Sequence, residues 1–177
     1  MTALMKTSRA DYLGNRYFRM GMRFALAILI FDQLTKWALL FVMRHFSSNE
    51  LVYEVLPFFN LVLVWNKGVS FGMFASHGEL YPFVLAGIAV VITFVLLGWL
   101  GNVKTKLPAA GIGLVIGGAI GNVIDRVRFG AVIDFLDFHV AGYHWPAFNV
   151  ADSAICIGVA LLLWDSFFGK TDEDAPH

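Results

Sequence analysis

The sequence has little charge, no net charge and a single cysteine. Lys, Arg, Asp and Glu make up 15% of its 177 residues, whereas soluble domains usually carry about 25%. The 13 basic and 13 acidic residues cancel, so composition gives no attraction to nucleic acid. Cys156 alone cannot form an internal disulfide. No H-E-x-x-H or Cys/His pair with metal-ligand spacing is present, so we expect neither a metal nor another cofactor.

Apolar residues are abundant and form long runs. They make up 58% of the chain, with a mean hydropathy of +0.69. Each run approaches the roughly 20 residues that cross a bilayer core of about 30 Å. The predicted spans are residues 22–43, 81–100, 107–124 and 150–168. Buried helices of a soluble protein are the alternative, but so short a chain has too little polar sequence to cover them. We expect a single integral membrane domain over residues 1–177, an all-α bundle of four transmembrane helices with small extracytoplasmic β segments.

The distribution of Lys and Arg predicts the orientation of the bundle. Basic residues gather before the first span, in the second connection and after the last span, which lie on one side if the chain crosses four times. These residues are Lys6, Arg9, Arg16, Arg19, Arg23, Lys104, Lys106 and Lys170. The positive-inside rule makes that side the cytoplasm, although Arg44, Lys67 and Arg128 lie on the other side. Both termini are then cytoplasmic, and the first span is too long for a cleaved signal peptide.

Two longer segments, 44–80 and 127–149, then face outward. Each contains a β-branched and aromatic run flanked by turn residues, Leu61–Trp65 and Ala131–Phe138, which predicts two short strands. The first segment is too apolar for a free loop. We expect it to lie against the bilayer surface, with Trp65 and Tyr53 near the headgroups.

The first and third spans carry ionisable groups, which are costly within a bilayer. Asp32 and Lys36 lie one turn apart on one face of the first span, either as a functional pair or as a simple i,i+4 ion pair. In the third span, glycines recur every four residues at Gly113, Gly117 and Gly121 and allow close helix packing. A polar cluster follows on what we expect to be the last turn. It consists of Asn122, Asp125 and Arg126, and an ordinary interfacial cap is the alternative.

Two more acids are Asp134, which precedes the fourth span, and Asp152, which lies near its start. Asn149 and Asp152 have the spacing of a capping box, so capping explains them as well as catalysis does. Asp134 lies within the second predicted strand, where an acid is usually on the solvated face.

Topology nevertheless brings these polar residues together at the outer membrane face. They are Asn66, Asn122, Asp125, Arg126, Asp134, Asn149 and Asp152, with Asp32 and Lys36 reaching toward them from within the bilayer. Two neighbouring carboxylates can share one proton and activate a water molecule. The convergence therefore predicts acid–base hydrolysis at the membrane surface.

Five segments carry a family resemblance. In order, DQLTK, NKGVSF, GGAIGNVIDR, GAVIDF and FNVADSAI resemble the motif blocks of bacterial lipoprotein signal peptidase, also called signal peptidase II. The match runs from Asp32 to about Trp164. The resemblance implies an aspartic peptidase of the bacterial inner membrane, with its active site at the outer, periplasmic face. Such an enzyme removes the signal peptide of a prolipoprotein by cutting before a cysteine that carries diacylglycerol.

The resemblance also implies residue roles. It makes Asp134 and Asp152 the catalytic dyad and implies inhibition by globomycin-type antibiotics. The residues implied to line the substrate site are Asn66, Asn122, Arg126 and Asn149. Asp32 and Asp125 are implied to support the site, and we group Lys36 with them. The partners are therefore diacylglyceryl-prolipoproteins and membrane lipids, with no nucleic acid.

Other readings are weaker. GVSFG, from Gly68 to Gly72, matches a serine-hydrolase elbow around Ser70, where the family often has alanine, but the elbow needs an α/β sheet. His77, His139 and His144 form no motif with it, and we expect Cys156 to be a packing residue. A proton-coupled transporter would use Asp32 and Lys36 as a relay but usually has inverted repeats, which are absent here. A non-enzymatic assembly factor would tolerate loss of any single aspartate.

Local environment predicts the roles of the two acids. Asp152 lies in a first helical turn, where backbone N–H groups favour negative charge. Asp134 has apolar neighbours in sequence, which disfavour its charged form. We expect Asp152 to be the ionised member that activates water and Asp134 to hold the proton.

Overall fold

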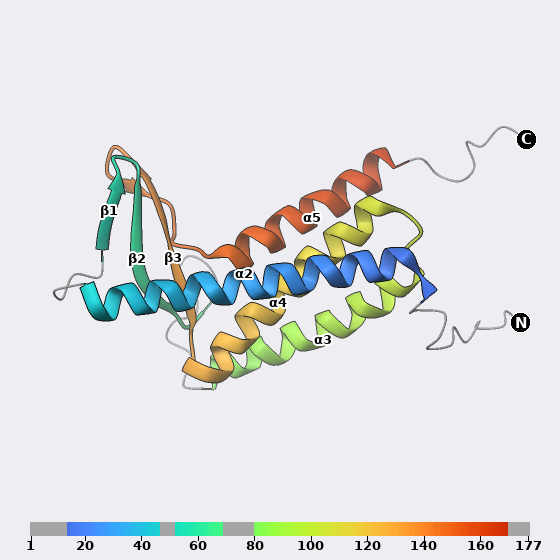
Figure 1. Ribbon diagram of the computed structural model, residues 1–177, viewed down its shortest axis with the longest axis horizontal. Helices are drawn as coiled ribbons and strands as arrows, with labels where there is room; N and C mark the ends of the chain where they lie inside the picture. The colour runs from blue at the N-terminus through green and yellow to red at the C-terminus, as the bar shows by residue number, and fades with distance from the viewer. Residues whose placement is uncertain (1–13, 47–51, 69–79, 170–177) are drawn as a thin grey trace, which may run out of the picture.

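The computed structural model describes residues 14–46, 52–68 and 80–169. Its helices lie side by side along the long axis, and a small sheet stands at one end (Figure 1). The elements are α2 (Arg16–Phe46), β1 (Val52–Leu56), β2 (Phe59–Asn66), α3 (Tyr81–Asn102), α4 (Lys106–Phe129), β3 (Val132–Val140), β4 (Tyr143–His144) and α5 (Val150–Phe168). All four helices are long and apolar enough to cross a membrane, which confirms the predicted fold class. Ser70, His77 and part of the predicted outward segment 44–80 lie outside the described residues.

Two helices are longer than the apolar runs that predicted them. α2 begins at Arg16 and α4 continues to Phe129, because hydropathy marks the apolar stretch and not the end of the hydrogen-bonded backbone. Gly130 ends α4 in the left-handed conformation at φ 66°, which glycine adopts without strain, and its N–H donates to the Arg126 carbonyl. Of the polar cluster predicted for the last turn of α4, Arg126 lies in that turn, whereas Asn122 and Asp125 precede it because the helix continues to Phe129.

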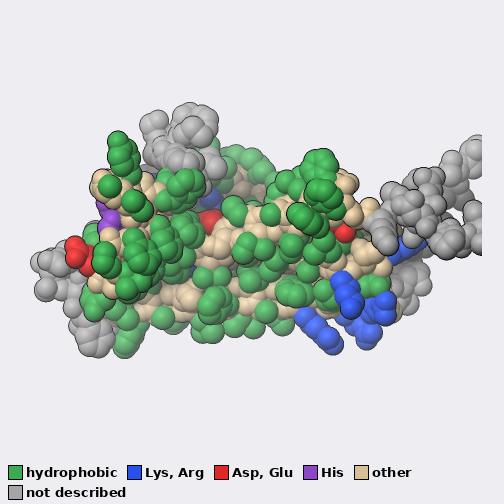
Figure 2. Space-filling view, turned by 90° about the horizontal axis from the view of Figure 1, so that it is seen from above, with side chains coloured by type: hydrophobic (Ala, Val, Ile, Leu, Met, Phe, Trp, Pro, Cys, Tyr) green, Lys and Arg blue, Asp and Glu red, His purple; other side chains and the backbone are tan. Residues whose placement is uncertain are grey.

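Helix α4 lies at the centre of the bundle and is mostly buried, whereas the membrane-length stretches of the other three helices are largely exposed. Its glycines face neighbouring backbones: Gly113 lies against Gly21 of α2, and Gly118 against Ala151 of α5. A methyl group at either position would collide with backbone atoms, so the predicted close packing is confirmed. On the face seen in Figure 2, hydrophobic side chains cover much of the bundle, and Lys and Arg gather at the end away from the sheet.

The sheet is antiparallel with strand order β1-β2-β3-β4. The two predicted strands correspond to β2 and β3, whose register places Val64 opposite Asp134. Strands β1 and β4 were not predicted. A buried apolar cluster of Leu39, Ile133 and Phe135 fixes β3 onto α2, so the acid of β3 has a defined position above the bundle.

Candidate active site

Asp134 and Asp152 meet where the sheet joins the bundle. Asp134 comes from β3, and Asp152 comes from the first turn of α5. Two asparagines connect them: Asn149 Nδ2 donates to Asp134 Oδ1 at 2.7 Å, and Asn122 Nδ2 donates to Asp152 Oδ1 at 2.8 Å. Asn149 Nδ2 also donates to Asn122 Oδ1 at 3.3 Å. The carboxylates are thus the two ends of one continuous chain of amides.

Asp134 is a buried acid with only neutral hydrogen-bond donors. It is 1% exposed, so the alternative that it lies on a solvated strand face is wrong. Asn66 Nδ2 donates to its second oxygen at 2.9 Å. Burial raises the pKa of Asp134 to about 7, and the nearby charge of Asp152 adds to the rise, while the two amides oppose it. Asp134 can therefore be protonated near neutral pH.

Asp152 both caps α5 and takes part in the cluster. Its backbone N–H donates to Asn149 Oδ1 at 2.9 Å, and its carboxylate accepts from the Asn149 N–H at 3.2 Å. The capping box is therefore real. The bond from Asn122 shows that the same carboxylate also has a partner from α4. A carboxylate in the first turn of a helix lies at the positive end of the helix dipole, which favours its negative charge.

Lys36 forms ion pairs with two acids. Its Nζ lies 2.9 Å from Asp32 Oδ2 and 2.7 Å from Asp125 Oδ2, and all three side chains are buried. The predicted i,i+4 pair is present, but it is part of a larger cluster, because Lys36 also donates to Asn122 Oδ1 at 3.2 Å. Asn122 in turn holds Asp152, so a buried positive charge is one amide away from the candidate dyad.

The two supporting acids also fix the backbone. Asp32 Oδ1 accepts from the Ala151 N–H at 3.0 Å, which joins α2 to the start of α5. Asp125 Oδ2 accepts from the Ile133 N–H at 3.2 Å, which joins α4 to β3. Each bond lies one residue away from a member of the candidate dyad.

Gln33 is a member of this cluster that the sequence reasoning missed. Its Nε2 lies 3.2 Å from Asp32 Oδ2 and 3.2 Å from Asp125 Oδ1. The available signal was its place inside the DQLTK segment. Helical periodicity gave no reason to include it, because adjacent residues point about 100° apart and only side-chain length brings the amide to both acids.

Arg126 borders the cluster without pairing with a carboxylate in the described part of the chain. Its Nη1 and Nη2 groups donate to the carbonyls of Asn122 and Gly68, each at 3.4 Å. Its Nε is buried and has no hydrogen-bond partner among the described residues. The Gly68 N–H in turn donates to Asn66 Oδ1 at 3.0 Å, so Arg126 and Asn66 meet at the same turn.

A cavity of about 350 Å³ opens beside Asp152. Apart from that carboxylate its lining is mainly apolar and includes Trp145, Pro146, Phe148 and Cys156. Cys156, which we expected to be a packing residue and not a nucleophile, is exposed on α5. This cavity places an apolar wall next to a candidate catalytic acid.

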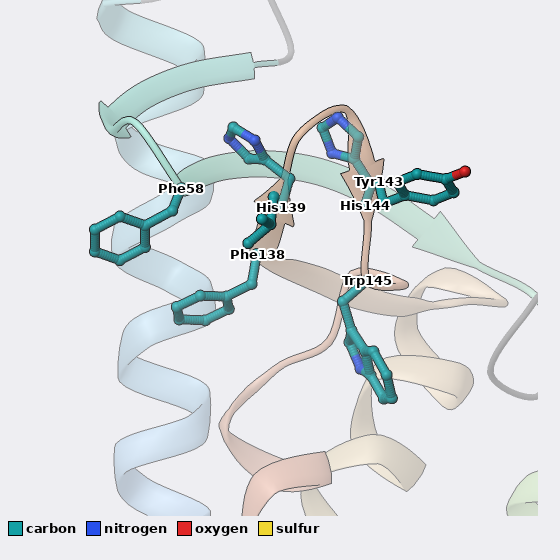
Figure 3. A pocket seen from close by; sticks show the side chains of 7 residues that line it. Phe58, Phe138, His139, Tyr143, His144 and Trp145 are labelled. Carbon is teal, nitrogen blue, oxygen red and sulfur yellow. The ribbon is translucent and has the colours of Figure 1, made fainter.

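A second cavity, of about 390 Å³, lies at the far edge of the sheet and contains none of these acids. Figure 3 shows it between the β3–β4 hairpin and Phe58, with the rings of His139 and His144 close together. These rings stack with centroids 4.8 Å apart. Asp137 is buried beside them and binds His144 Nδ1 at 2.9 Å and Asn60 Nδ2 at 3.0 Å. Asp137 therefore belongs to a separate polar group, although it is only three residues from Asp134.

Membrane-length helices with buried acids and amides at one end define an integral membrane protein with a polar site near the edge of the bilayer. Comparison with known families identifies it further. The family described as Signal peptidase (SPase) II matches residues 24–168, and the chain belongs to this family of membrane peptidases.

Individual relatives agree with this assignment. The lipoprotein signal peptidase of Rhodopseudomonas palustris is 43% identical over 162 residues, which cover 89% of this chain and 98% of that protein. That of Paraburkholderia phymatum is 49% identical over 144 residues, covering 80% and 83%. A bacterial membrane enzyme solved by the in meso method at 2.3 Å resolution is similar in structure, with a TM-score of 0.70 and 30% identity over 88% of this chain and 94% of that one.

Proposed function

We propose that the chain is an aspartic endopeptidase that removes signal peptides from diacylglyceryl-modified prolipoproteins, with Asp134 and Asp152 as its catalytic dyad. The observation that carries the proposal is the unbroken chain of amides between these carboxylates, Asp134–Asn149–Asn122–Asp152. It keeps two acids close together and gives each a different environment. The names of the relatives supply the substrate class.

The two environments support a division of labour. Asp152, at a helix N-terminus, is the ionised member and takes a proton from a water molecule whose oxygen attacks the scissile carbonyl carbon. Asp134, whose pKa is raised to about 7, holds a proton and donates it to the carbonyl oxygen. When the tetrahedral intermediate collapses, the C–N bond breaks, the proton on Asp152 passes to the leaving amine, and Asp134 regains its own from the hydroxyl that becomes the new carboxyl group.

The neighbouring groups would bind the peptide. Arg126 has a buried Nε–H without a partner in the described chain, which suits a peptide carbonyl. Asn66 and Asn149 orient Asp134, and Asn122 orients Asp152. The supporting acids Asp32 and Asp125, joined by Lys36, hold the backbone of β3 and α5 next to the dyad. Globomycin-type inhibitors would occupy the same site.

A lipid-modified substrate gives a reason for the membrane setting. Acyl chains attached to the cysteine cannot leave the bilayer without exposure to water, so the peptidase must come to the membrane surface. The apolar cavity beside Asp152 supports this. The basic end of the bundle opposite the sheet supports an inner-membrane orientation with both termini in the cytoplasm and the dyad at the outer face (Figure 2).

Competing mechanisms have less support. Apart from Asp165 near the end of α5, the acids of the described helices and strands lie toward the sheet end and do not follow a path through the bundle, as a transporter would require. For a serine or cysteine mechanism, the sequence pairs neither Ser70 nor Cys156 with a general base in a recognisable motif. We expect Ser70→Ala and Cys156→Ala to keep most activity and chelators to have no effect. A large loss of turnover in folded Ser70→Ala protein would restore the serine mechanism.

Cleavage by purified full-length protein tests the function directly. A prolipoprotein with diacylglyceryl cysteine should be cut before that cysteine, and the same chain without the lipid should be cut much more slowly. No cleavage of the modified substrate by folded protein would contradict the proposed function. Equal cleavage of both substrates would remove only the lipid requirement.

A further inference from the structure

Two arginines at the sheet end are exceptions to the charge pattern of the bundle. Arg44 lies near the end of α2, and Arg128 lies next to the last residue of α4. Both line one groove of about 230 Å³ on the outside of the bundle. The other residues of the groove are Trp37, Leu40, Phe41 and Phe129. The groove therefore combines two positive charges with an apolar wall.

Aromatic rings hold one of these charges in place. The Arg128 guanidinium carbon lies 5.5 Å from the centre of the Trp37 ring and 4.9 Å from that of Phe129. Such contacts use the flat face of the guanidinium and leave its N–H groups at the edge free to donate. Neither arginine forms a salt bridge with a carboxylate in the described ranges. The described protein therefore leaves both charges available to an anion.

We propose that this groove binds one anionic phospholipid, with the phosphate between Arg44 and Arg128 and an acyl chain along the apolar wall. The guanidinium fork matches phosphate oxygens, and both arginines lie at the helix ends, where a membrane helix reaches the headgroups. The apolar wall favours a lipid over free phosphate. Trp37 is 61% and Phe41 58% exposed, and both lie on a membrane-spanning helix, so a lipid chain can reach them from the bilayer.

The groove shares no residue with the cluster of acids, so its occupancy can be measured without peptidase activity. The full-length protein in nanodiscs is illuminated with phosphatidylglycerol or phosphatidylcholine that carries the same photoreactive acyl chain. Mass spectrometry then locates the labelled peptides. Phosphatidylglycerol should label the segments 37–44 and 126–129 several-fold more than phosphatidylcholine. Equal labelling of these segments by the two lipids would overturn the proposal.

Charge variants separate a specific site from general attraction. Arg44→Gln/Arg128→Gln should reduce phosphatidylglycerol labelling of the groove to the phosphatidylcholine level. Arg19→Gln/Arg23→Gln removes the same charge at the other end of α2 and should leave groove labelling unchanged. If it lowers that labelling equally, the selectivity reflects net charge and the site is wrong. Arg44→Lys/Arg128→Lys keeps the charge but removes the guanidinium groups. This variant should still prefer phosphatidylglycerol over phosphatidylcholine, but less than the unchanged protein does.

A competition arm separates lipid from free phosphate. Glycerol phosphate at high concentration offers the same anionic group without acyl chains. It should leave labelling of the groove unchanged. Displacement of the lipid by glycerol phosphate would overturn the phospholipid as occupant and indicate a site for soluble phosphate.

Discussion

Lys36 of α2 and Asp125 of α4 form a buried ion pair, with 2.7 Å between Nζ and Oδ2. The same ammonium group holds Asp32 at 2.9 Å, so a single positive charge is shared by two carboxylates from different helices. Because the three side chains are buried, neither acid can exchange this partner for water. The two buried carboxylates of α2 and α4 therefore share one lysine as their positively charged partner.

Replacement of this lysine should destabilise the protein strongly. Lys36→Met leaves buried carboxylates without their charged partner, a change that typically costs about 3–5 kcal/mol. Thermal unfolding of the purified protein in detergent measures the effect. Lys67→Met removes the same charge from an exposed residue at the sheet end and should change the unfolding temperature little. Equal effects of the two substitutions would show that the buried cluster has no special role.

The candidate dyad predicts a loss of cleavage without a loss of folding. Asp134→Asn and Asp152→Asn keep the size of the side chains but remove the groups that carry the proton, so each should abolish cleavage while substrate still binds. Turnover and binding of the modified prolipoprotein are measured on the same preparations. Asp137→Asn is the matched control, because Asp137 lies on the same strand but contacts His144 and Asn60. It should keep most activity, and normal cleavage by either dyad variant would show the mechanism to be wrong.

The proposed orientation can be tested with single cysteines in a Cys156→Ala background. Tyr143→Cys is suitable at the sheet end because Tyr143 is 85% exposed. Lys104→Cys is suitable at the other end, because Lys104 is exposed in the connection between α3 and α4. An impermeant thiol reagent added to intact cells should label the first variant, and the second only after lysis. The opposite pattern would reverse the topology and place the acids on the cytoplasmic side.

Sequence patterns predicted the helices and the gathering of the acids because both depend on properties that can be read along the chain. Runs of apolar residues marked four spans, and the number of crossings placed Asp134 and Asp152 at the same end. The capping box was also visible, since it needs only the three-residue spacing of Asn149 and Asp152. These features depend on residues close together in the sequence or on the number of membrane crossings.

The features that the sequence did not predict depend on how helices and strands pack against one another. The spacing of Asp32 and Lys36 showed an ion pair within one helix, but nothing in the sequence aims Lys36 at Asp125 of another helix. Burial of Asp134 likewise follows from packing of β3 on the bundle. Strand β1 has all five residues exposed and β4 has only two residues, so neither shows the alternation that marks a half-buried strand.

Asp134 should make stability depend on pH. Its pKa is raised to about 7 by burial and by the charge of Asp152. In an unfolded chain an aspartate titrates near pH 3.9. Between these two pKa values the folded protein keeps a proton that the unfolded chain has lost. The free energy of unfolding therefore falls as the pH rises toward about 7. Above that pH both states have lost the proton, and Asp134 no longer changes the free energy of unfolding. Asp134→Asn should flatten this fall between pH 5 and 7 in thermal unfolding, and Asp165→Asn at the other end of α5 should leave it unchanged.

The same proton should appear in the kinetics. If Asp134 must be protonated to polarise the scissile carbonyl, turnover should decrease above about pH 7, by up to about tenfold per pH unit, as the proton is lost. Because interacting carboxylates titrate as a pair, the profile reports the dyad, and infrared spectroscopy of the carboxyl groups is needed to locate the proton. The Asp152→Asn variant has no carboxyl group at residue 152. If the proton is on Asp134, this variant should still show the infrared band of a protonated carboxyl group. Loss of that band in Asp152→Asn but not in Asp134→Asn would place the proton on Asp152, which reverses the two roles and leaves the dyad intact.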